Sequence, residues 1–590
     1  MKRLHRTLLA VALAFSAAPA LAAGGDGDAR VTRERQVALP EVLSASEREQ
    51  YRAVFADLEA QNWAAAAGRL DGMREGPLHP LARARLYTMP GSPRVEMDPL
   101  LRLLARAPEL PQAGDLARLA RLRGATELPD LPQAQRLSGL AGQPRRARPR
   151  PVRGDPVGDA IEPLIQPLLV ADQPYEAETL FNARSAELSD EARTAFQQRI
   201  AWVFFLNGND RDARRIAEQG ARGITEWAIH SHWVAGLAAW RMEDFGGAAE
   251  HFRTVAARSS DQELSAAGHY WAARADTAGG HPQRVQGQLQ AAARMGETFY
   301  GLLAQSRLGI RQSPADLDAF SAEDWRALSG LANVRTALAL AEIGKDGLAG
   351  ELLRHQARIG DPRQHEALLH LASRLNLTSA QMWLAHNGPR GTRTDAHDRY
   401  PSPSWRPQSG RWRVDPALAF AHALQESNFR PEAVSPAGAR GLMQVLPGTA
   451  QQMARARGVA ADPTRLNDPS VNIEYGQTYL EWLRDQPGTG GLLPRVIAAY
   501  NAGPRPISEW NTRFDQSDPL LFIESIPYWE TRGYVPIILR NYWVYEERPA
   551  SDSPSRRALA QGMWPRFPGM SGPTAVRIES RRSQTAMGRD

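Results

Sequence analysis

The feature that most constrains the fold is a series of helix-breaking turns at nearly equal spacing within a long helical pattern. The turns lie at Asn207–Asp210, Glu243–Asp244 and Gly279–Gly280, a spacing near 36 residues. After the second turn, Ala248 and Phe252 stand four residues apart, on the face that one helix of a hairpin buries against its mate. Helix pairs with this period predict an α-solenoid, in which each hairpin stacks on the next to bury its apolar face. A long helical domain without repeats would produce similar turns and stays the alternative.

The rest of the chain divides around this helical region by composition. Its length is that of two to four domains, so we expect several separate cores. The expected order is a signal peptide at 1–22, an N-terminal helical region at 23–140, an Arg/Pro-rich linker at 141–158, the α-superhelical repeat domain at 159–387, a second linker at 388–404, a compact C-terminal domain at 405–549 and a disordered tail at 550–590.

The absence of cysteine and the placement of charge exclude several classes of protein. With no Cys among 590 residues, disulfides, iron–sulfur clusters and thiol nucleophiles are excluded. The formal charge of +6 comes largely from the two ends of the chain, which leaves the body nearly neutral. Binding to many phosphates needs a local excess of cations. The one internal candidate is a run of Arg and Pro at 144–153, here called the Arg/Pro segment, and this composition is typical of a solvated linker. We therefore expect no nucleic-acid partner.

The N-terminus has the pattern of an export signal. Lys2, Arg3 and Arg6 precede the apolar run 8–15, and small residues lead to a cleavage site after Ala22. The apolar run is shorter than the roughly 20 residues that a spanning helix needs. No other stretch has the composition of a membrane span, so we expect an exported, soluble protein of a bacterial periplasm, without an integral membrane segment after signal cleavage.

Motifs for cofactors and metals are absent or wrongly spaced. The chain has no phosphate-binding Gly-rich loop followed by Lys and Ser or Thr, and no strand-borne dinucleotide fingerprint. His365 and His370 flank a Glu but stand five residues apart, about 140° around a helix, whereas a zinc-binding helix needs a spacing of four. We expect no metal site and no cofactor.

The most informative residue is Glu426, near the end of a predicted helix. Asp415 is a good N-cap and Pro416 a good first helical residue, and Pro431 lies beyond the helix end. At this position the negative end of the helix dipole and partial burial both disfavour a carboxylate. Glu426 should therefore hold its proton near neutral pH, as a general acid must.

Four ordered blocks surround and follow this residue. After Gln425–Phe429, which contains Glu426, come the sequences SPAGARGLMQ at 435–444, AYNAGP at 499–504 and FIESIPYWETRGYV at 522–535. In this order and over about 110 residues they resemble the catalytic domain of soluble lytic murein transglycosylases, glycoside hydrolase family 23, which is related to goose-type lysozyme. A fainter resemblance covers Thr298–Gly309, which is similar to a segment of the helical superstructure in the large periplasmic members.

The resemblance implies a mainly α fold, with an α-superhelical ring or solenoid followed by a lysozyme-like C-terminal catalytic domain. It also implies cleavage of the β-1,4 bond between N-acetylmuramic acid and N-acetylglucosamine in peptidoglycan glycan strands, with 1,6-anhydromuramoyl products. A single carboxylic acid suits this reaction, because the substrate's own C6 hydroxyl is the nucleophile. An ordinary glycosidase needs two carboxyl groups.

The same resemblance assigns roles to individual residues. Glu426 is the catalytic acid and then the base. The implied substrate-binding residues are Ser435 and Gln444 for hydrogen bonds to the sugar, Met443 for packing on a sugar face, Tyr500 and Asn501 beside the scissile sugar or Glu426, and Glu524 along the cleft. Packing or capping roles are the alternative for each of them. Arg532 either meets peptide-stem carboxylates or bridges to Glu530 or Glu524.

Two other functions stay open at this level. A muramidase would use the same Glu426 with water as the nucleophile and Glu524 as the second carboxylate. A non-catalytic peptidoglycan-binding scaffold would use the solenoid for protein partners, which the sequence does not identify.

Overall fold

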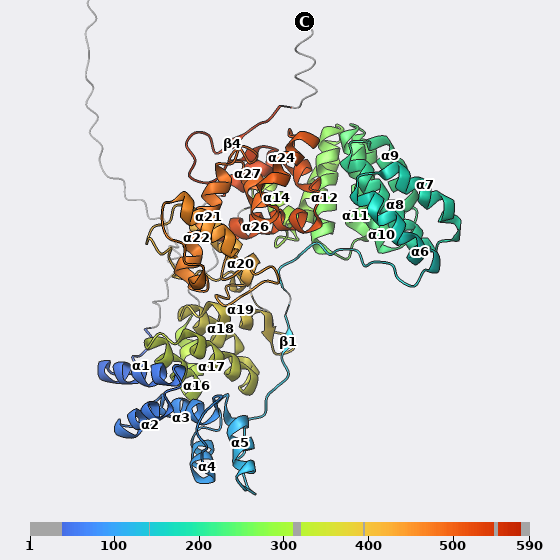
Figure 1. Ribbon diagram of the computed structural model, residues 1–590. Helices are drawn as coiled ribbons and strands as arrows, with labels where there is room; N and C mark the ends of the chain where they lie inside the picture. The colour runs from blue at the N-terminus through green and yellow to red at the C-terminus, as the bar shows by residue number, and fades with distance from the viewer. Residues whose placement is uncertain are drawn as a thin grey trace, which may run out of the picture.

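The computed structural model describes residues 38–140, 142–310, 320–392, 394, 396–547 and 553–579. Helices dominate, and within these residues the strands are two antiparallel pairs of two residues each. The chain forms a lower N-terminal body, a long curved arm and an upper C-terminal domain (Figure 1). The predicted fold class is therefore confirmed: a mainly α chain with a superhelical part and a separate C-terminal helical domain.

The arm is the superhelical part, and its turns keep the predicted period. Residues with positive φ lie in the turns between the two helices of successive hairpins, at Asp172, Gly208, Glu243 and Gly280, spaced 35 to 37 residues apart. Neighbouring helices bury Ala and aromatic side chains against one another, as at Trp233, Phe252 and Trp271. The arm consists of α6 (Pro156–Val170), α7 (Pro174–Arg184), α8 (Asp190–Leu206), α9 (Asp210–Ala221), α10 (Glu226–Arg241), α11 (Phe245–Arg258), α12 (Gln262–Ala278), α13 (Pro282–Ala293) and α14 (Phe299–Leu308).

The repeat domain ends earlier than the sequence predicted. Residues 320–386 do not continue the arm but share a core with the N-terminal helices. Glu342 accepts hydrogen bonds from the backbone of Val42 and Leu43, and Asn333 donates to the carbonyl of Glu109 at 2.8 Å. The body contains α1 (Ala45–Glu59), α2 (Trp63–Gly72), α3 (His79–Thr88), α4 (Met97–Arg106), α5 (Ala113–Leu122), α15 (Ala322–Leu328), α16 (Ala332–Glu342), α17 (Asp346–Ile359), α18 (His365–Arg374) and α19 (Thr378–His386). The expected extent of the repeat domain, 159–387, is thus corrected, because residues 320–386 bury one apolar surface together with the N-terminal helices, which lie far away in the sequence.

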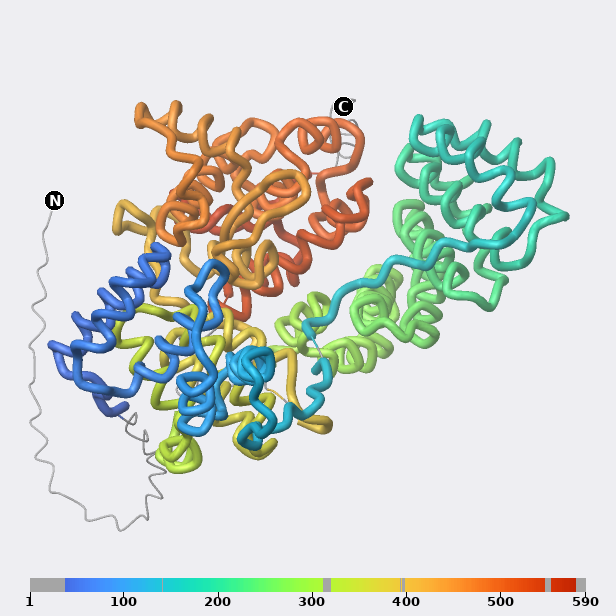
Figure 2. The backbone as a smooth tube through the Cα atoms, turned by 60° about the horizontal axis from the view of Figure 1, so that its bottom comes forward, coloured from blue at the N-terminus to red at the C-terminus, as the bar shows by residue number. Residues whose placement is uncertain are grey.

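The Arg/Pro segment is extended, as a linker should be, but part of it is packed rather than solvated. It runs from the N-terminal body along the arm (Figure 2). Arg146 forms a bidentate pair with Glu524 at 2.6 and 3.0 Å, and its guanidinium lies 4.9 Å from the ring centroid of Trp233. Arg540 donates to the carbonyl of Pro144, and Trp227 donates to that of Arg150 at 3.0 Å. The prediction of a solvated linker is wrong here, because the segment lies in the junction between the arm and the C-terminal domain.

The second expected linker is also anchored. At its start, β2 (Asn387–Gly388) pairs with β1 (Ser138–Gly139). The chain leaves the N-terminal body twice, after β1 and after β2, and the pairing places these two exits side by side. Tyr400 is buried and donates to Asn541, and the carbonyl of Pro401 accepts from Tyr545 at 2.9 Å.

The C-terminal domain is a cluster of helices that packs on the end of the arm. Its core is continuous with that of the arm, through contacts such as the stacked rings of Phe299 and Trp543 at 5.1 Å. Its helices are α20 (Pro416–Ser427), α21 (Pro447–Ala456), α22 (Pro469–Arg484), α23 (Leu493–Ala502), α24 (Pro504–Arg513), α25 (Pro519–Glu524) and α26 (Trp529–Glu547).

The prediction of a disordered tail after residue 549 is wrong for residues 553–579. They form α27 (Pro554–Ala560) and the pair β3 (Trp564–Pro565) and β4 (Ala575–Val576). Trp564 is fully buried and donates to the carbonyl of Gln516 at 2.7 Å, and Leu559 is also buried. Single large apolar anchors hold this segment in place, and such anchors leave no periodic pattern in the sequence.

The expected signal peptide at 1–22 lies outside the described residues. Among the helices that the structure describes, none is long and apolar enough to cross a membrane.

Candidate active site

Glu426 lies in the last turn of α20, on a helix that is capped at both ends. Asp415 accepts from the backbone N–H of Ala417 at 2.9 Å, with Pro416 in the first position, as the sequence predicted. At the other end Asn428 has a left-handed conformation with φ +50°, which ends the helix. Ser427, the residue after Glu426, is buried and donates to the carbonyl of Leu442 at 2.8 Å. The end of α20 is thereby fixed to the loop of the second sequence block.

The carboxyl group of Glu426 has a pKa that is raised into the neutral range. Its side chain is only partly exposed, and burial raises its pKa to about 7. The negative charge of Glu530 raises this pKa further, whereas the hydroxyl of Tyr534, which donates to Oε1 at 2.5 Å, lowers it. The raised pKa expected for Glu426 thus has burial as its main cause.

The loop of the second block is held against the end of α20 by a buried amide. Asn472 on α22 accepts from the N–H of Met443 at 2.8 Å and donates to the carbonyls of Arg440 and Leu466, each at 2.8 Å. Gly441 at φ +75° brings the chain so close that an added Cβ would stand 2.2 Å from the Leu466 carbonyl oxygen. Only glycine fits both the conformation and the space at this position.

We expect Gly441→Ala to destabilise the C-terminal domain by at least about 2 kcal/mol, because it adds a backbone clash to the cost of a left-handed residue. Gly438→Ala is the matched control. It has a similar φ of +81° but open space around the Cβ, so only about 1 kcal/mol of strain is expected. Urea unfolding of the two variants measures the difference, and equal midpoints would contradict the close packing described for Gly441.

The substrate-binding residues predicted in the second block mostly build the loop. Met443 is fully buried against Gly476, so the expected packing of its side chain on a sugar face is wrong. Ser435 accepts from the N–H of Ala439 at 3.0 Å and is partly exposed. Gln444 is partly exposed, and its Nε2 donates to the carbonyls of Ala433 and Gly441.

Tyr500 and Asn501 lie at the end of α23, and Tyr500 lies near Glu426 without a hydrogen bond to it. The hydroxyl of Tyr500 donates to the carbonyl of Met443 at 2.8 Å. Burial raises the pKa of Tyr500 well above its usual value, and the nearby charge of Glu426 adds to this shift. Asn501 donates to Glu530 at 3.2 Å and accepts from Thr531 at 2.6 Å. Tyr500 therefore holds the loop of the second block in place, and Asn501 holds the first turn of α26.

Glu524 does not line a cleft beside Glu426, which corrects the role predicted for it. Its side chain is 1% exposed, and both of its oxygens are engaged. Arg146 contacts them in bidentate fashion, and the hydroxyl of Tyr300 donates to Oε1 at 2.7 Å. Glu524 therefore joins the C-terminal domain to the arm.

Sequence reasoning missed the side chains that surround Glu426. Tyr534 and Glu530 stand four residues apart on one face of α26, and both act on the pKa of Glu426. His422, one turn before Glu426, is fully buried, and its ring centroid lies 4.6 Å from that of Tyr500. The i, i+4 spacing of Glu530 and Tyr534 inside the fourth block was the available signal.

We expect Tyr534→Phe to raise the pKa of Glu426 above about 7, because the hydroxyl that stabilises the carboxylate is removed. An acid with a higher pKa stays protonated to higher pH. The alkaline limb of the kcat/KM profile on isolated sacculi should therefore move upward, by up to about one pH unit. Tyr500→Phe, whose hydroxyl bonds to a backbone carbonyl, is the control. If the alkaline limb of the Tyr534→Phe profile does not move, the hydrogen bond from Tyr534 does not set the pKa of Glu426.

Nothing in the described part of the chain forms a metal centre, since no group of three or more His, Asp or Glu side chains is arranged to hold an ion. His365 instead bonds to the carbonyl of Leu384 at 3.0 Å, and His370 contacts Asp324 at 3.2 Å.

Comparison with known families identifies the class of this domain. Residues 403–522 match the family described as the transglycosylase SLT domain. The match includes Glu426 and the first three sequence blocks and ends before α26, which carries Tyr534. The C-terminal part of the chain is therefore similar to the transglycosylase SLT domain over residues 403–522.

Among named proteins, the chain is similar to soluble lytic murein transglycosylases. The one from Escherichia coli (strain K12) is 38% identical over 164 residues, which is 27% of this chain and 24% of that protein. Membrane-bound lytic murein transglycosylase C from Histophilus somni (strain 2336) is 38% identical over 109 residues, 17% of this chain and 30% of that protein. The chain thus matches about a quarter of the length of these relatives.

Two solved structures share the fold over most of the chain. An inactive Glu-to-Gln mutant of the lytic transglycosylase Slt from Pseudomonas aeruginosa superposes with a TM-score of 0.52 at 21% identity, over 87% of this chain and 74% of that one. The 70-kDa soluble lytic transglycosylase in complex with bulgecin A has a TM-score of 0.50 at 18% identity, over 89% of this chain and all of that one. At these identities the likeness shows the fold, including the superhelical part and the separate C-terminal domain.

Proposed function

We propose that this protein is a lytic transglycosylase of peptidoglycan. It cleaves the β-1,4 bond between N-acetylmuramic acid and N-acetylglucosamine and leaves 1,6-anhydromuramoyl ends. The observation that carries this proposal is Glu426, a partly exposed carboxyl group with a pKa of about 7 inside a transglycosylase SLT domain. A pKa near the working pH lets one group both donate and accept a proton.

The reaction follows from this one carboxyl group. Protonated Glu426 donates its proton to the glycosidic oxygen, and the bond from that oxygen to C1 of the muramoyl residue breaks. The C6 hydroxyl of the same residue attacks C1, and the Glu426 carboxylate takes the hydroxyl proton. The attack is intramolecular, so no bound water has to be activated. Glu426 is protonated again at the end of the cycle.

The names of the relatives support this proposal and a location in the cell wall compartment. The similar proteins are named for lytic transglycosylase activity on murein, and a Glu-to-Gln mutant of one structural relative is described as inactive. Together with the signal pattern at 1–22, this supports export to the periplasm, with peptidoglycan strands as the partner.

The products of sacculus digestion test the proposal. Purified sacculi treated with the full chain should release muropeptides whose mass is that of the 1,6-anhydro form. This form is lighter by one water than the product of hydrolysis. Muropeptides with reducing muramic acid ends would refute the transglycosylase and establish a muramidase. If no muropeptides are released, the protein is a binding scaffold.

One observation favours the muramidase as the second candidate. Glu530 is an exposed carboxylate whose charge raises the pKa of Glu426, so the two groups are near each other. Retaining and inverting glycosidases place a second carboxylate close to the acid. Glu530→Gln distinguishes the two, since a transglycosylase keeps most of its activity, whereas a muramidase loses its nucleophile or base.

A further inference from the structure

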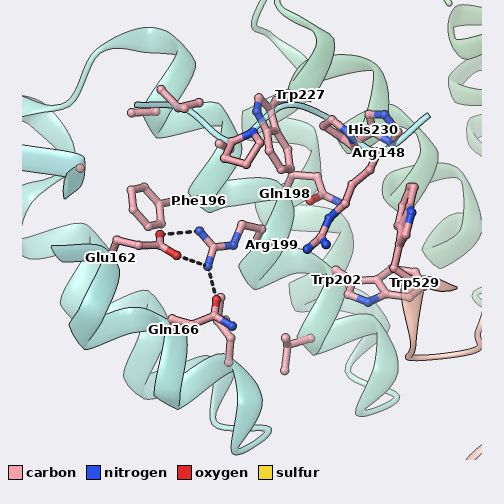
Figure 3. A pocket seen from close by; sticks show the side chains of 18 of the residues that line it. Arg148, Glu162, Gln166, Phe196, Gln198, Arg199, Trp202, Trp227, His230 and Trp529 are labelled. Atoms are coloured by element: carbon pink, nitrogen blue, oxygen red, sulfur yellow. Dashed lines mark hydrogen bonds and ion pairs between the residues drawn. The ribbon is translucent and has the colours of Figure 1, made fainter. Parts of the chain in front are cut away.

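A cavity lies outside the Glu426 site, between the arm and the beginning of α26. Its volume is about 710 Å³, in the range of small-ligand sites. The walls come from α6, α8, α10, the Arg/Pro segment and residues 527–532. Side chains of Trp202, Trp227 and Trp529 point toward this space, with Arg148 entering from the Arg/Pro segment (Figure 3). The cavity therefore combines large apolar surfaces with a cation.

Three arginines without an acidic ion-pair partner among the described residues line the cavity, Arg148 and Arg153 on the Arg/Pro segment and Arg532 on α26. Arg532 lies 4.1 Å from the ring centroid of Trp202 and 5.0 Å from that of Trp529, and it donates to the carbonyl of Ile526 at 2.7 Å. Within the described residues, neither Arg532 nor the exposed Arg148 forms an ion pair with a carboxylate. Burial lowers the pKa of Arg532 to about 9. The charges of Arg146 and Arg148 act in the same direction, and the charge of Glu524 opposes them.

The carboxylates that line the same cavity are already engaged. Glu162 forms a bidentate pair with Arg199 at 2.6 and 2.9 Å, which Figure 3 shows. Asp155 accepts from two backbone N–H groups as the cap of α6, and Asp159 accepts from another at 3.2 Å. The three arginines outnumber Asp155 and Asp159, which have no cationic partner among the described residues, so the lining keeps a net positive charge beside the indole rings. Planar guanidinium groups in this setting match a carboxylate.

We propose that this cavity binds a peptide stem of peptidoglycan, with Arg148 and Arg532 on a stem carboxylate and Trp202 and Trp529 against its aliphatic part. The inference rests on the proposed function, because that function supplies a substrate that carries acidic peptides along a glycan chain. The cavity thereby selects strands that still carry their stems.

The position of the cavity relative to Glu426 fits this assignment. Glu530 and Tyr534 act on Glu426, whereas Trp529 and Arg532 line the cavity, so the first turns of α26 separate the two sites. A helix with its side chains is about 10 to 12 Å across. An extended stem of four or five residues spans roughly 13 to 18 Å. Half the circumference of such a helix is about 16 to 19 Å, which is comparable to the length of a fully extended stem.

Titration of a free stem tetrapeptide into the full chain tests the proposal without any glycosidic bond. We expect saturable binding by calorimetry, with quenching of tryptophan fluorescence. Arg148→Ala should weaken the affinity at least about 10-fold. Arg150→Ala, another exposed arginine of the Arg/Pro segment outside the cavity lining, should leave it unchanged. The amidated tetrapeptide should bind more weakly, and chitin oligosaccharides should not compete.

The outcomes separate this site from the proposed function. Absence of peptide binding, or equal affinities for Arg148→Ala and Arg150→Ala, would overturn the assignment of the cavity. If the protein cleaves sacculi to anhydro products but fails this titration, only the cavity proposal is refuted. If it binds the peptide with the expected dependence on Arg148 but leaves sacculi intact, the cavity stands and the catalytic proposal fails.

Discussion

Replacing Glu426 by Gln should reduce the release of muropeptides from sacculi by at least about 10³-fold. General acid–base catalysis contributes roughly 10² to 10⁴ in rate, and here one carboxyl group supplies both the acid and the base. The amide has almost the shape of the carboxyl group but cannot transfer the proton. Release of soluble muropeptides with time, followed by chromatography and mass spectrometry, measures the loss.

The same variant should be more stable than the parent at alkaline pH. The pKa of Glu426 is raised to about 7 in the folded chain. Between the unfolded pKa near 4.5 and this value the folded state binds more protons, so the stability of the parent falls as the pH rises through this window. Gln carries no charge at any pH. Glu426→Gln should therefore gain about 1 to 3 kcal/mol relative to the parent at pH 8, and no such gain at pH 4.

Glu530→Gln is the matched control for both measurements, the release of muropeptides and the dependence of stability on pH. It removes a nearby charge from the surface of α26, so the pKa of Glu426 should fall while most of the activity remains. Full activity of Glu426→Gln would show that another group is the acid. A gain in stability that does not depend on pH would show that Glu426 is not buried as a carboxylate.

Replacing Arg146 by Met should destabilise the junction between the arm and the C-terminal domain by about 3 to 5 kcal/mol. Arg146 is the ion-pair partner of Glu524, which is 1% exposed, and its loss leaves a buried carboxylate with only the Tyr300 hydroxyl as a side-chain donor. A change of this size corresponds to a fall of about 10 °C in the unfolding midpoint of a domain of this size. Differential scanning calorimetry measures it.

The double variant Arg146→Met with Glu524→Gln should recover most of this loss. The remaining side chains are uncharged, and a buried pair replaced by neutral groups is often close to neutral in stability. Arg150→Met, in the same segment but exposed, should leave the midpoint unchanged. A normal midpoint for Arg146→Met alone would contradict the structural role given to the pair.

Local pattern predicted the arm well and the shared core poorly. Turns near residues 208, 243 and 280 follow from helix-breaking residues and apolar spacing, which act within one hairpin. That residues 320–386 pack on the N-terminal helices depends on contacts such as Asn333 to the Glu109 carbonyl, 224 residues apart. The order of the tail also depends on a distant contact, because the buried indole of Trp564 donates to the carbonyl of Gln516. Local pattern could not predict this contact.

In the site, the sequence pointed to the acid but assigned some of its neighbours wrongly. Glu426 stands at a helix end between recognisable blocks, and its raised pKa follows from that position. Met443 and Glu524 belong to the same blocks, yet both are buried. Tyr534 and Glu530 affect the pKa of Glu426, because one face of α26 packs against the end of α20.

By itself the sequence determined the helical repeat of the arm, and it predicted the class of the C-terminal domain and Glu426 as its acid. These depend on periodicity and on short blocks, which are local properties of the chain. Only the tertiary structure decided which groups surround that acid and that Arg146 neutralises Glu524 from 378 residues away. Such pairings arise when separate segments bury a common surface, and burial then decides which charges must be paired and which carboxyl group keeps its proton.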